Sequence, residues 1–186
     1  MPSFHFKTLF AAVVVVLAGI AGCAGDSVGS RDQGSIAKSN SAPAAPPAAA
    51  GELKPRKANL PDLPEGAGPM DADAPDEFVP TRSGLYYRIL RKSNGRKPRS
   101  TDKVLAHYKG WLDNGQKFDS SYEHGEPTEF ALNAVVPGWT EGLQLIGEGG
   151  MIELEVPPRL GYGAHGNAGV PPNSRLHFIV ELKKIE

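Results

Sequence analysis

The chain has 186 residues, with 20 Lys and Arg side chains against 21 Asp and Glu, and a formal net charge of −1. This balance argues against a nucleic-acid partner, because phosphate backbones are bound by basic surfaces. A single cysteine excludes an internal disulfide, a cysteine-rich zinc cluster and a CxxC redox pair. The 22 glycines and 17 prolines exceed ordinary globular usage, which predicts that part of the chain does not fold.

Residues 1–22 have the pattern of an export signal. Lys7 precedes an entirely apolar run from Leu9 to Ala18, and small residues follow up to Gly22. A charged start, a short apolar run and small residues at the end predict a secretory signal peptide. The run is short for a membrane-spanning helix, which needs about 20 apolar residues, so an uncleaved anchor is the weaker alternative.

Ile20-Ala21-Gly22-Cys23 resembles the bacterial lipobox, in which an aliphatic residue and two small residues precede a lipidated cysteine. The resemblance implies that Cys23 becomes the acylated first residue of the mature protein, held on a membrane by its acyl chains. The alternative is an inert buried thiol. Ala24 follows, where an aspartate would resemble the inner-membrane retention signal of enteric bacteria. We therefore expect a bacterial cell-envelope protein, at the outer membrane facing the periplasm more readily than at the inner membrane.

Residues 23–76 have the composition of a disordered linker. They contain eight prolines, six glycines and no aromatic residue, and five basic against eight acidic side chains. Such a segment buries too little apolar surface to offset the entropy lost on ordering. Its few large apolar residues show no helical or strand period; they are Val28, Ile36, Leu53, Leu60, Leu63 and Met70. We expect this segment to act as a tether.

Residues 77–186 are predicted to form the folded domain, since they hold all five tyrosines and both tryptophans. A strand is expected near residues 85–90, and residues 104–109 alternate with Val104, Ala106 and Tyr108 on one face. Asp113-Asn114-Gly115 predicts a hairpin turn. Residues 152–156 and 176–183 alternate as half-buried strands.

One short helix is expected after Pro137-Gly138, because Trp139, Leu143 and Ile146 share one helical face. The glycines at 147, 149 and 150 would end it. Several strands with a single helix predict an antiparallel α+β domain, with the helix packed on one face of a curved sheet.

Two glycine motifs and the histidines carry no cofactor or metal chemistry. Residues 161–166 spell GxGxxG, but the prolines that follow forbid the helix that a dinucleotide site requires. Residues 147–150 lack the Lys-Ser/Thr of a phosphate-binding loop. The histidines show no metal-ligand spacing, and no GxSxG motif is present. The sequence therefore predicts neither a metal site nor covalent catalysis.

Four stretches resemble the motifs of one family. Taken in order along the chain, they are similar to the motifs of FKBP-type peptidyl-prolyl cis-trans isomerases. The resemblance is greatest to the bacterial macrophage infectivity potentiator-like branch and covers about residues 81–186. This resemblance implies a five- or six-stranded antiparallel sheet wrapped around one short helix. The stretches are His107-Tyr108-Lys109-Gly110, Lys117-Phe118-Asp119-Ser120-Ser121, Val135-Val136-Pro137-Gly138-Trp139-Thr140-Glu141-Gly142, and Gly161-Tyr162-Gly163 continuing to Pro171-Pro172-Asn173-Ser174.

The resemblance also implies a pocket for a substrate proline. Its catalytic residues would be Phe118, Asp119, Tyr162 and Trp139, with Trp139 as the pocket floor. Its substrate-binding residues would be Tyr108, Val135, Val136, Val170 and Phe178. Ordinary core packing is the alternative for Tyr108, Phe178 and Trp139, and a turn cap is the alternative for Asp119. The chain departs from the family pattern at His124, Thr128, Leu160 and Asn167.

The implied activity is isomerisation of X-Pro bonds, through non-covalent stabilisation of the twisted amide in an aromatic pocket. No cofactor is expected. The implied partners are proline-containing unfolded or exported polypeptides, a membrane through the lipid anchor and, as candidate ligands, the macrolides tacrolimus and rapamycin. A monomer is expected. One alternative is a non-catalytic chaperone or adaptor lipoprotein that binds proline-containing peptides, and another is a surface lipoprotein in which the tether matters more than the domain.

Overall fold

The computed structural model describes residues 53–58 and 63–186 of the chain. The predicted signal peptide, the predicted lipidation site Cys23 and most of the predicted tether lie outside these residues. Among the helices that are described, none combines the length and the apolar character needed to cross a membrane.

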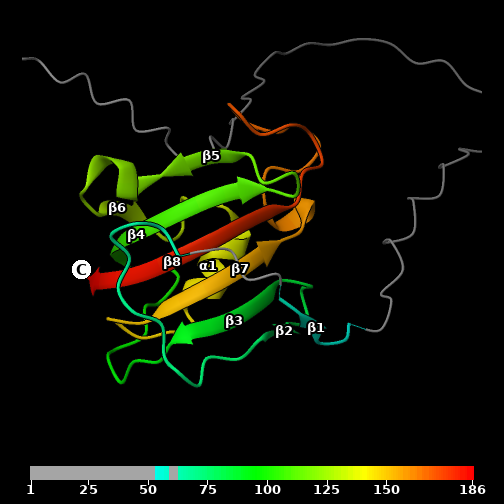
Figure 1. The fold of residues 1–186 in the computed structure, drawn as a ribbon. Helices are drawn as coiled ribbons and strands as arrows, with labels where there is room; N and C mark the ends of the chain where they lie inside the picture. The colour runs from blue at the N-terminus through cyan, green and yellow to red at the C-terminus, as the bar shows by residue number, and fades with distance from the viewer. Residues whose placement is uncertain (1–52, 59–62) are drawn as a thin grey trace, which may run out of the picture. The chain divides into compact units, whose positions relative to one another are not determined.

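The strands form one antiparallel sheet (Figure 1). Its order is β1-β2-β3-β7-β8-β4-β5, and β6 also pairs with β4. The two longest strands, β4 and β8, pair side by side from Val104 opposite Ile185 to Leu112 opposite Leu176. The strands are β1 (Arg56–Lys57), β2 (Glu77–Pro80), β3 (Tyr86–Arg91), β4 (Lys103–Leu112), β5 (Lys117–Ser120), β6 (Thr128–Ala131), β7 (Met151–Val156) and β8 (Leu176–Ile185).

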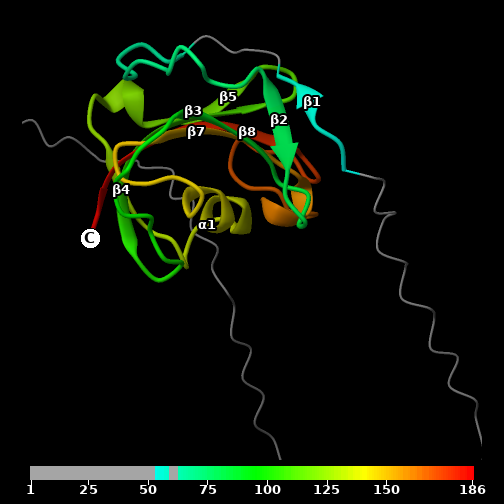
Figure 2. The ribbon, with the colours of Figure 1, turned by 90° about the horizontal axis from the view of Figure 1, so that it is seen from below.

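One α-helix, α1 (Pro137–Leu143), lies against one face of the curved sheet, as Figure 2 shows. Proline is accepted at its first position because no intrahelical partner is needed there. The predicted apolar stripe is confirmed, since Trp139, Leu143 and Ile146 are all buried. The helix ends at Leu143, before the glycines that were predicted to end it. Beyond it, the amides of Leu145 and Ile146 each donate to the carbonyl three residues earlier. Two 3-10 helices, η1 (Ser121–His124) and η2 (Pro158–Leu160), follow β5 and β7.

The strands predicted by alternation are all present, as is the turn after residue 112. The antiparallel α+β class is therefore confirmed. The sheet has eight strands where five or six were expected. The alternation pattern could not reveal β1, β2, β5 and β6, which have two to four residues each and are too short to show a period of two.

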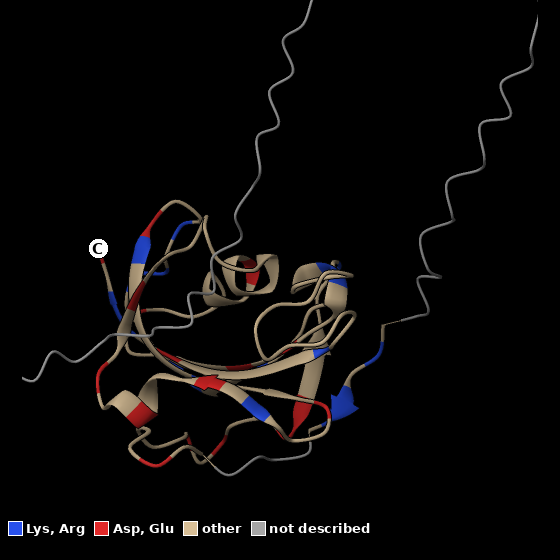
Figure 3. Ribbon diagram, turned by 90° about the horizontal axis from the view of Figure 1, so that it is seen from above, with Lys and Arg blue, Asp and Glu red and all other residues tan. Residues whose placement is uncertain are grey.

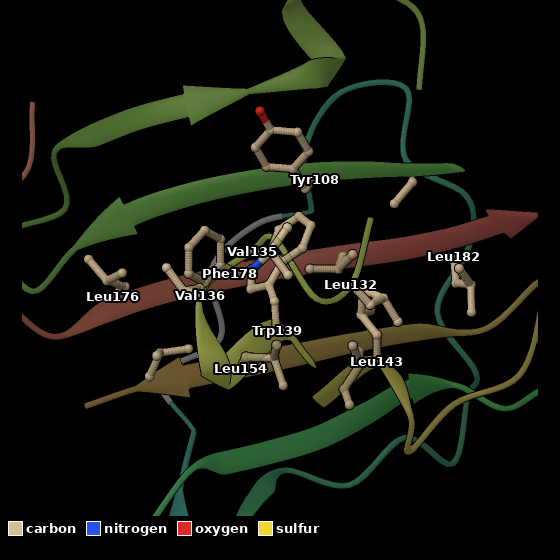
Figure 4. Packing of buried hydrophobic residues seen from close by; sticks show 14 of the residues in the cluster. Tyr108, Leu132, Val135, Val136, Trp139, Leu143, Leu154, Leu176, Phe178 and Leu182 are labelled. Carbon is tan, nitrogen blue, oxygen red and sulfur yellow. The ribbon is translucent and has the colours of Figure 1, made fainter. Parts of the chain in front are cut away.

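The core lies between α1 and the inner face of the sheet. Figure 4 shows Trp139 extending from α1 toward Tyr108 of β4 and Phe178 of β8. The alternation predicted for β4 is confirmed, because Val104 and Ala106 are fully buried beside Tyr108 on the same face. The helix therefore meets side chains from several strands at once.

The outer face of the sheet is covered by residues 63–76, the covering segment (Figure 2). Leu63 and Ala67 pack against a buried cluster of Leu90, Met151 and Ile179. The amide of residue 71 donates to the carbonyl of residue 90 at 2.8 Å. These contacts lie upstream of residue 77, the predicted start of the folded domain. The covering segment has little apolar surface of its own. It is ordered because its residues pack against the sheet and form hydrogen bonds with it.

Arginines of β3 bind the covering segment to the sheet. Arg88 pairs with Glu153 and Arg91 pairs with Glu181, and each arginine also donates to a backbone carbonyl of the covering segment at 3.1 Å. Glu153 and Glu181 are 1% and 2% exposed. The prediction that β7 and β8 are only half buried is therefore wrong at these two positions, because the covering segment shields this face from water.

A Gly142→Ala substitution tests how closely α1 packs on β7. Alanine raises helix propensity by about 1 kcal/mol, but a Cβ atom here would lie 2.7 Å from Leu154 Cδ2. Overpacking costs about 1–3 kcal/mol, so we expect a net destabilisation in urea unfolding. Adding Leu154→Val should make the double variant more stable than the sum of the two single changes predicts. Stabilisation by Gly142→Ala alone would contradict the close packing.

Candidate functional site

The candidate site is built around a hydrogen bond between neighbouring strands. Tyr108 points inward from β4 and is 4% exposed, and Asp119 lies on the adjacent β5. The Tyr108 hydroxyl donates to Asp119 Oδ2 at 2.6 Å. A carboxylate is thus fixed at the edge of an apolar cluster, in an orientation set by a buried phenol.

Aromatic rings surround the Trp139 indole edge-on. The ring centroids of Tyr108, Phe130 and Phe178 lie 5.3, 5.1 and 5.4 Å from that of Trp139, with interplanar angles of 76–82°. Phe118 continues the arrangement by meeting Phe178 at 5.5 Å. Edge-to-face packing of this kind favours one fixed arrangement of the rings.

Gly110 makes room for two of these rings. It lies opposite Phe178 in the pairing of β4 with β8. A Cβ atom at this position would come within 2.6 Å of Phe118 and 2.9 Å of Phe178. Glycine inside a strand weakens it, so its presence marks a close approach by other atoms. The sequence analysis quoted Gly110 in a motif but assigned it no role.

A glycine-rich loop between η2 and β8 carries the remaining side chains. Tyr162 is half buried and packs against the core cluster, and Val170 is 4% exposed. The Tyr162 side chain has a hydrogen bond with Asn167, and it lies within electrostatic reach of Asp119. The loop has no helix, as the sequence predicts, and its tip at Gly169 approaches Phe118.

Val136 presents a backbone donor beside the aromatic rings. Val135 and Val136 are both buried and precede α1, and Val136 is its N-cap residue. The Val136 carbonyl accepts from the amides of Trp139 and Thr140. Its own N–H has no acceptor within residues 53–58 and 63–186. This group is therefore available to a ligand carbonyl.

The structure brings the predicted site residues together around the fully buried Trp139 indole. The partly exposed side chains around it are Phe118, Asp119, Phe130 and Tyr162.

The two phenols of the site are held in their neutral form. Burial raises the pKa of Tyr108, and the hydrogen bond and charge of Asp119 raise it further. Burial also raises the pKa of Tyr162; the hydrogen bond with Asn167 acts in the opposite direction and the charge of Asp119 adds to the rise. Both hydroxyl groups therefore remain donors at neutral pH.

Phe130 is the site residue that sequence reasoning missed. It lies on β6, meets Tyr108 at 5.4 Å and contacts Trp139. The four-residue strand β6 gave too short an alternation to reveal its inward face. The register of β6 on β4, with Val104 opposite Phe130, is what brings the ring to the indole.

Comparisons with known proteins match this part of the chain. The family model of the FKBP-type peptidyl-prolyl cis-trans isomerases matches residues 94–183. FKBP-type peptidyl-prolyl cis-trans isomerase FkpA of Escherichia coli (strain K12) is 47% identical over 114 residues, which are 61% of this chain and 42% of that protein. The chain thus spans less than half the length of this curated relative.

Solved structures show the same similarity. The crystal structure of FkpA from Escherichia coli superposes with a TM-score of 0.57 and 46% identity, covering 59% of this chain and 51% of that one. A peptidyl-prolyl cis-trans isomerase from Pseudomonas syringae pv. tomato gives 0.55 and 31%, covering 59% and 80%. AtFKBP13 gives 0.54 and 32%, covering 59% and 98%.

An Asp119→Asn variant tests the electrostatic part of the site. Removing the carboxylate charge should lower the pKa of Tyr108, and to a smaller extent that of Tyr162, because the charge of Asp119 raises both. The pKa of Tyr108 should stay above its ordinary value, since burial is the main cause of its rise. Titration of the tyrosine ring carbons by NMR measures both values, and Asp102→Asn on an outer loop is the control. Unchanged tyrosine pKa values in Asp119→Asn would refute the coupling.

Proposed function

The chain belongs to the FKBP-type peptidyl-prolyl cis-trans isomerase family, and we propose that it catalyses the cis–trans isomerisation of X-Pro bonds in exported polypeptides. The observation that carries the proposal is the Tyr108–Asp119 pair at the edge of an aromatic cluster, together with the N–H of Val136, which has no acceptor among the residues that the structure describes. This arrangement offers an apolar surface for a proline ring and fixed polar groups for the amide next to it.

The reaction needs stabilisation of a twisted amide and no bond cleavage. Resonance gives the X-Pro bond partial double-bond character and a barrier of about 18–20 kcal/mol. At the transition state this resonance is lost. A site that binds the twisted form better than either planar form lowers the barrier, and about 5 kcal/mol corresponds to several thousand-fold acceleration.

The residues of the site fit separate parts of this task. Phe118, Phe178 and Tyr108 supply apolar ring faces that exclude water from the amide. The Val136 N–H and the Tyr162 hydroxyl donate to substrate carbonyls and hold the twist. Asp119 orients the Tyr108 ring through its hydrogen bond and acts as a fixed charge, not as a proton shuttle.

The same proposal includes the cellular setting implied by the N-terminal sequence. The lipobox-like segment ending at Cys23 supports a lipoprotein of the bacterial envelope, at the outer membrane facing the periplasm. Within the family, the resemblance of the motifs places the chain in the macrophage infectivity potentiator-like branch as part of this proposal. Proline-containing exported polypeptides are the proposed substrates, the macrolides tacrolimus and rapamycin are candidate inhibitors, and a monomer is the proposed state.

A tyrosine pair tests the catalytic assignment. Tyr162→Phe removes a donor to the twisted amide and should lower kcat/KM by about tenfold in a protease-coupled assay on a Leu-Pro peptide. Tyr122→Phe is the matched control, because the Tyr122 hydroxyl donates to Glu181 outside the site, and it should retain activity. No acceleration by the wild-type protein at micromolar concentration would favour a non-catalytic peptide-binding protein.

Cys23→Ser tests the anchor. Without a thiol to acylate, the protein should leave the membrane fraction, since the acyl chains supply its membrane affinity. Fractionation of cells expressing each form measures this outcome. Retention of the variant in the membrane would show that the apolar run of the signal segment remains as an uncleaved anchor.

A further inference from the structure

Three arginines from distant parts of the chain line one cleft at the β1 edge of the sheet. Arg56 lies on β1, Arg159 lies in η2, and Arg175 directly precedes β8. The cleft has a volume of about 230 Å³. In Figure 3, β1 and the segment beside it are blue, and other Lys and Arg positions lie elsewhere on the ribbon. The other lining residues are Leu53, Gly84, Tyr86, Glu155 and Pro157.

The cleft carries more positive charge than its one carboxylate can balance. Arg56 forms an ion pair with Glu155, and its guanidinium lies 4.1 Å from the centre of the Tyr86 ring. Arg159 donates to a backbone carbonyl, which does not neutralise it. Arg175 is exposed and has neither a hydrogen bond nor an ion pair in the part of the chain that the structure describes.

Arg56 also presents an unused donor. Its Nε atom is buried and has no hydrogen-bond acceptor among the described residues, and Oε2 of its ion-pair partner Glu155 is buried there without a hydrogen bond as well. Burial lowers the pKa of Arg56 and the neighbouring charge of Arg175 lowers it further, while Tyr86 and the carboxylate of Asp113 act in the opposite direction. An anion between Arg56 and Arg175 would offset the repulsion of the two guanidinium groups and accept from the Nε–H of Arg56.

We propose that this cleft is a binding site for an anion of the phosphate class. A tetrahedral oxyanion directs oxygens toward several donors at once, so it can accept from Arg56, Arg159 and Arg175 together. A carboxylate holds its two oxygens in one plane and is matched by a single guanidinium. The site is separate from the aromatic cluster, because the two share no residue.

Two sources supply such an anion: free phosphate and the phosphodiester headgroup of a membrane lipid. Leu53, which lines the cleft, follows the proposed lipid attachment site in the chain. A headgroup bound here would hold the domain against the surface to which Cys23 is anchored. The chemistry of recognition is the same for both sources.

Titration of the full chain with inorganic phosphate tests the site. The arginine Nε–H signals in ¹⁵N NMR spectra should shift saturably for Arg56 and Arg175. Arg175→Gln should weaken binding by about tenfold, because the anion then loses one of its three guanidinium partners. Lys97→Gln, which removes an exposed charge outside the cleft, should leave the affinity within about twofold. Shifts that do not saturate, or equal weakening by both variants, would overturn the proposal.

The second arm of the experiment separates the two sources. Glycerophosphoglycerol is the soluble headgroup of phosphatidylglycerol, and binding at least as tight as that of inorganic phosphate would identify a lipid headgroup as the ligand. Binding of inorganic phosphate alone would identify the free ion. A glutamate-rich peptide that binds at the cleft while neither phosphate compound does would refute the phosphate class in favour of carboxylates.

Discussion

The close approach of α1 to the sheet is the constraint on which the candidate site depends. Gly138 and Gly142 face β7, where added Cβ atoms would come within 2.6 Å of Val156 and 2.7 Å of Leu154. Without side chains at these two positions the helix backbone settles directly on the strand. Trp139, between them in sequence, is then carried into the ring cluster. A helix held farther out would leave a cavity under the indole, and filling it would require larger residues and a different site.

The close packing of α1 on the sheet also separates the apolar and polar parts of the site. The inner rings are fixed by packing, and their substitution would alter stability together with function. Asp119, Tyr162 and the N–H of Val136 lie at the border of this packing, and each presents a polar group beside an apolar surface. In a site of low dielectric such groups interact strongly with a developing charge distribution. The geometry thus offers an apolar surface and polar groups at its border within one part of the domain.

Local pattern was enough to predict the fold class and the inward faces of Tyr108 and Trp139, but not what depends on strand register. Alternation along β4 placed Tyr108 inward, and the spacing around Trp139 placed the indole on the buried face of α1. Neither pattern could show that Gly110 lies opposite Phe178, or that Phe130 reaches the indole, because these are contacts across strands.

The covering segment was missed for a different physical reason. Its composition resembles that of a disordered chain, and it is ordered by contacts that the sheet supplies, chiefly the arginines of β3 and a small apolar cluster. The buried Arg88–Glu153 pair is tolerated because the two charges remain paired and Arg88 also donates to the carbonyl of Pro75. Upstream of residue 77, the chain also supplies Arg56 to the cleft at the β1 edge. A chain beginning at residue 77 would keep every residue of the aromatic site and lose both the cover of the outer face and one third of the arginine cluster, so the upstream segment extends the isomerase fold with a second, charged surface.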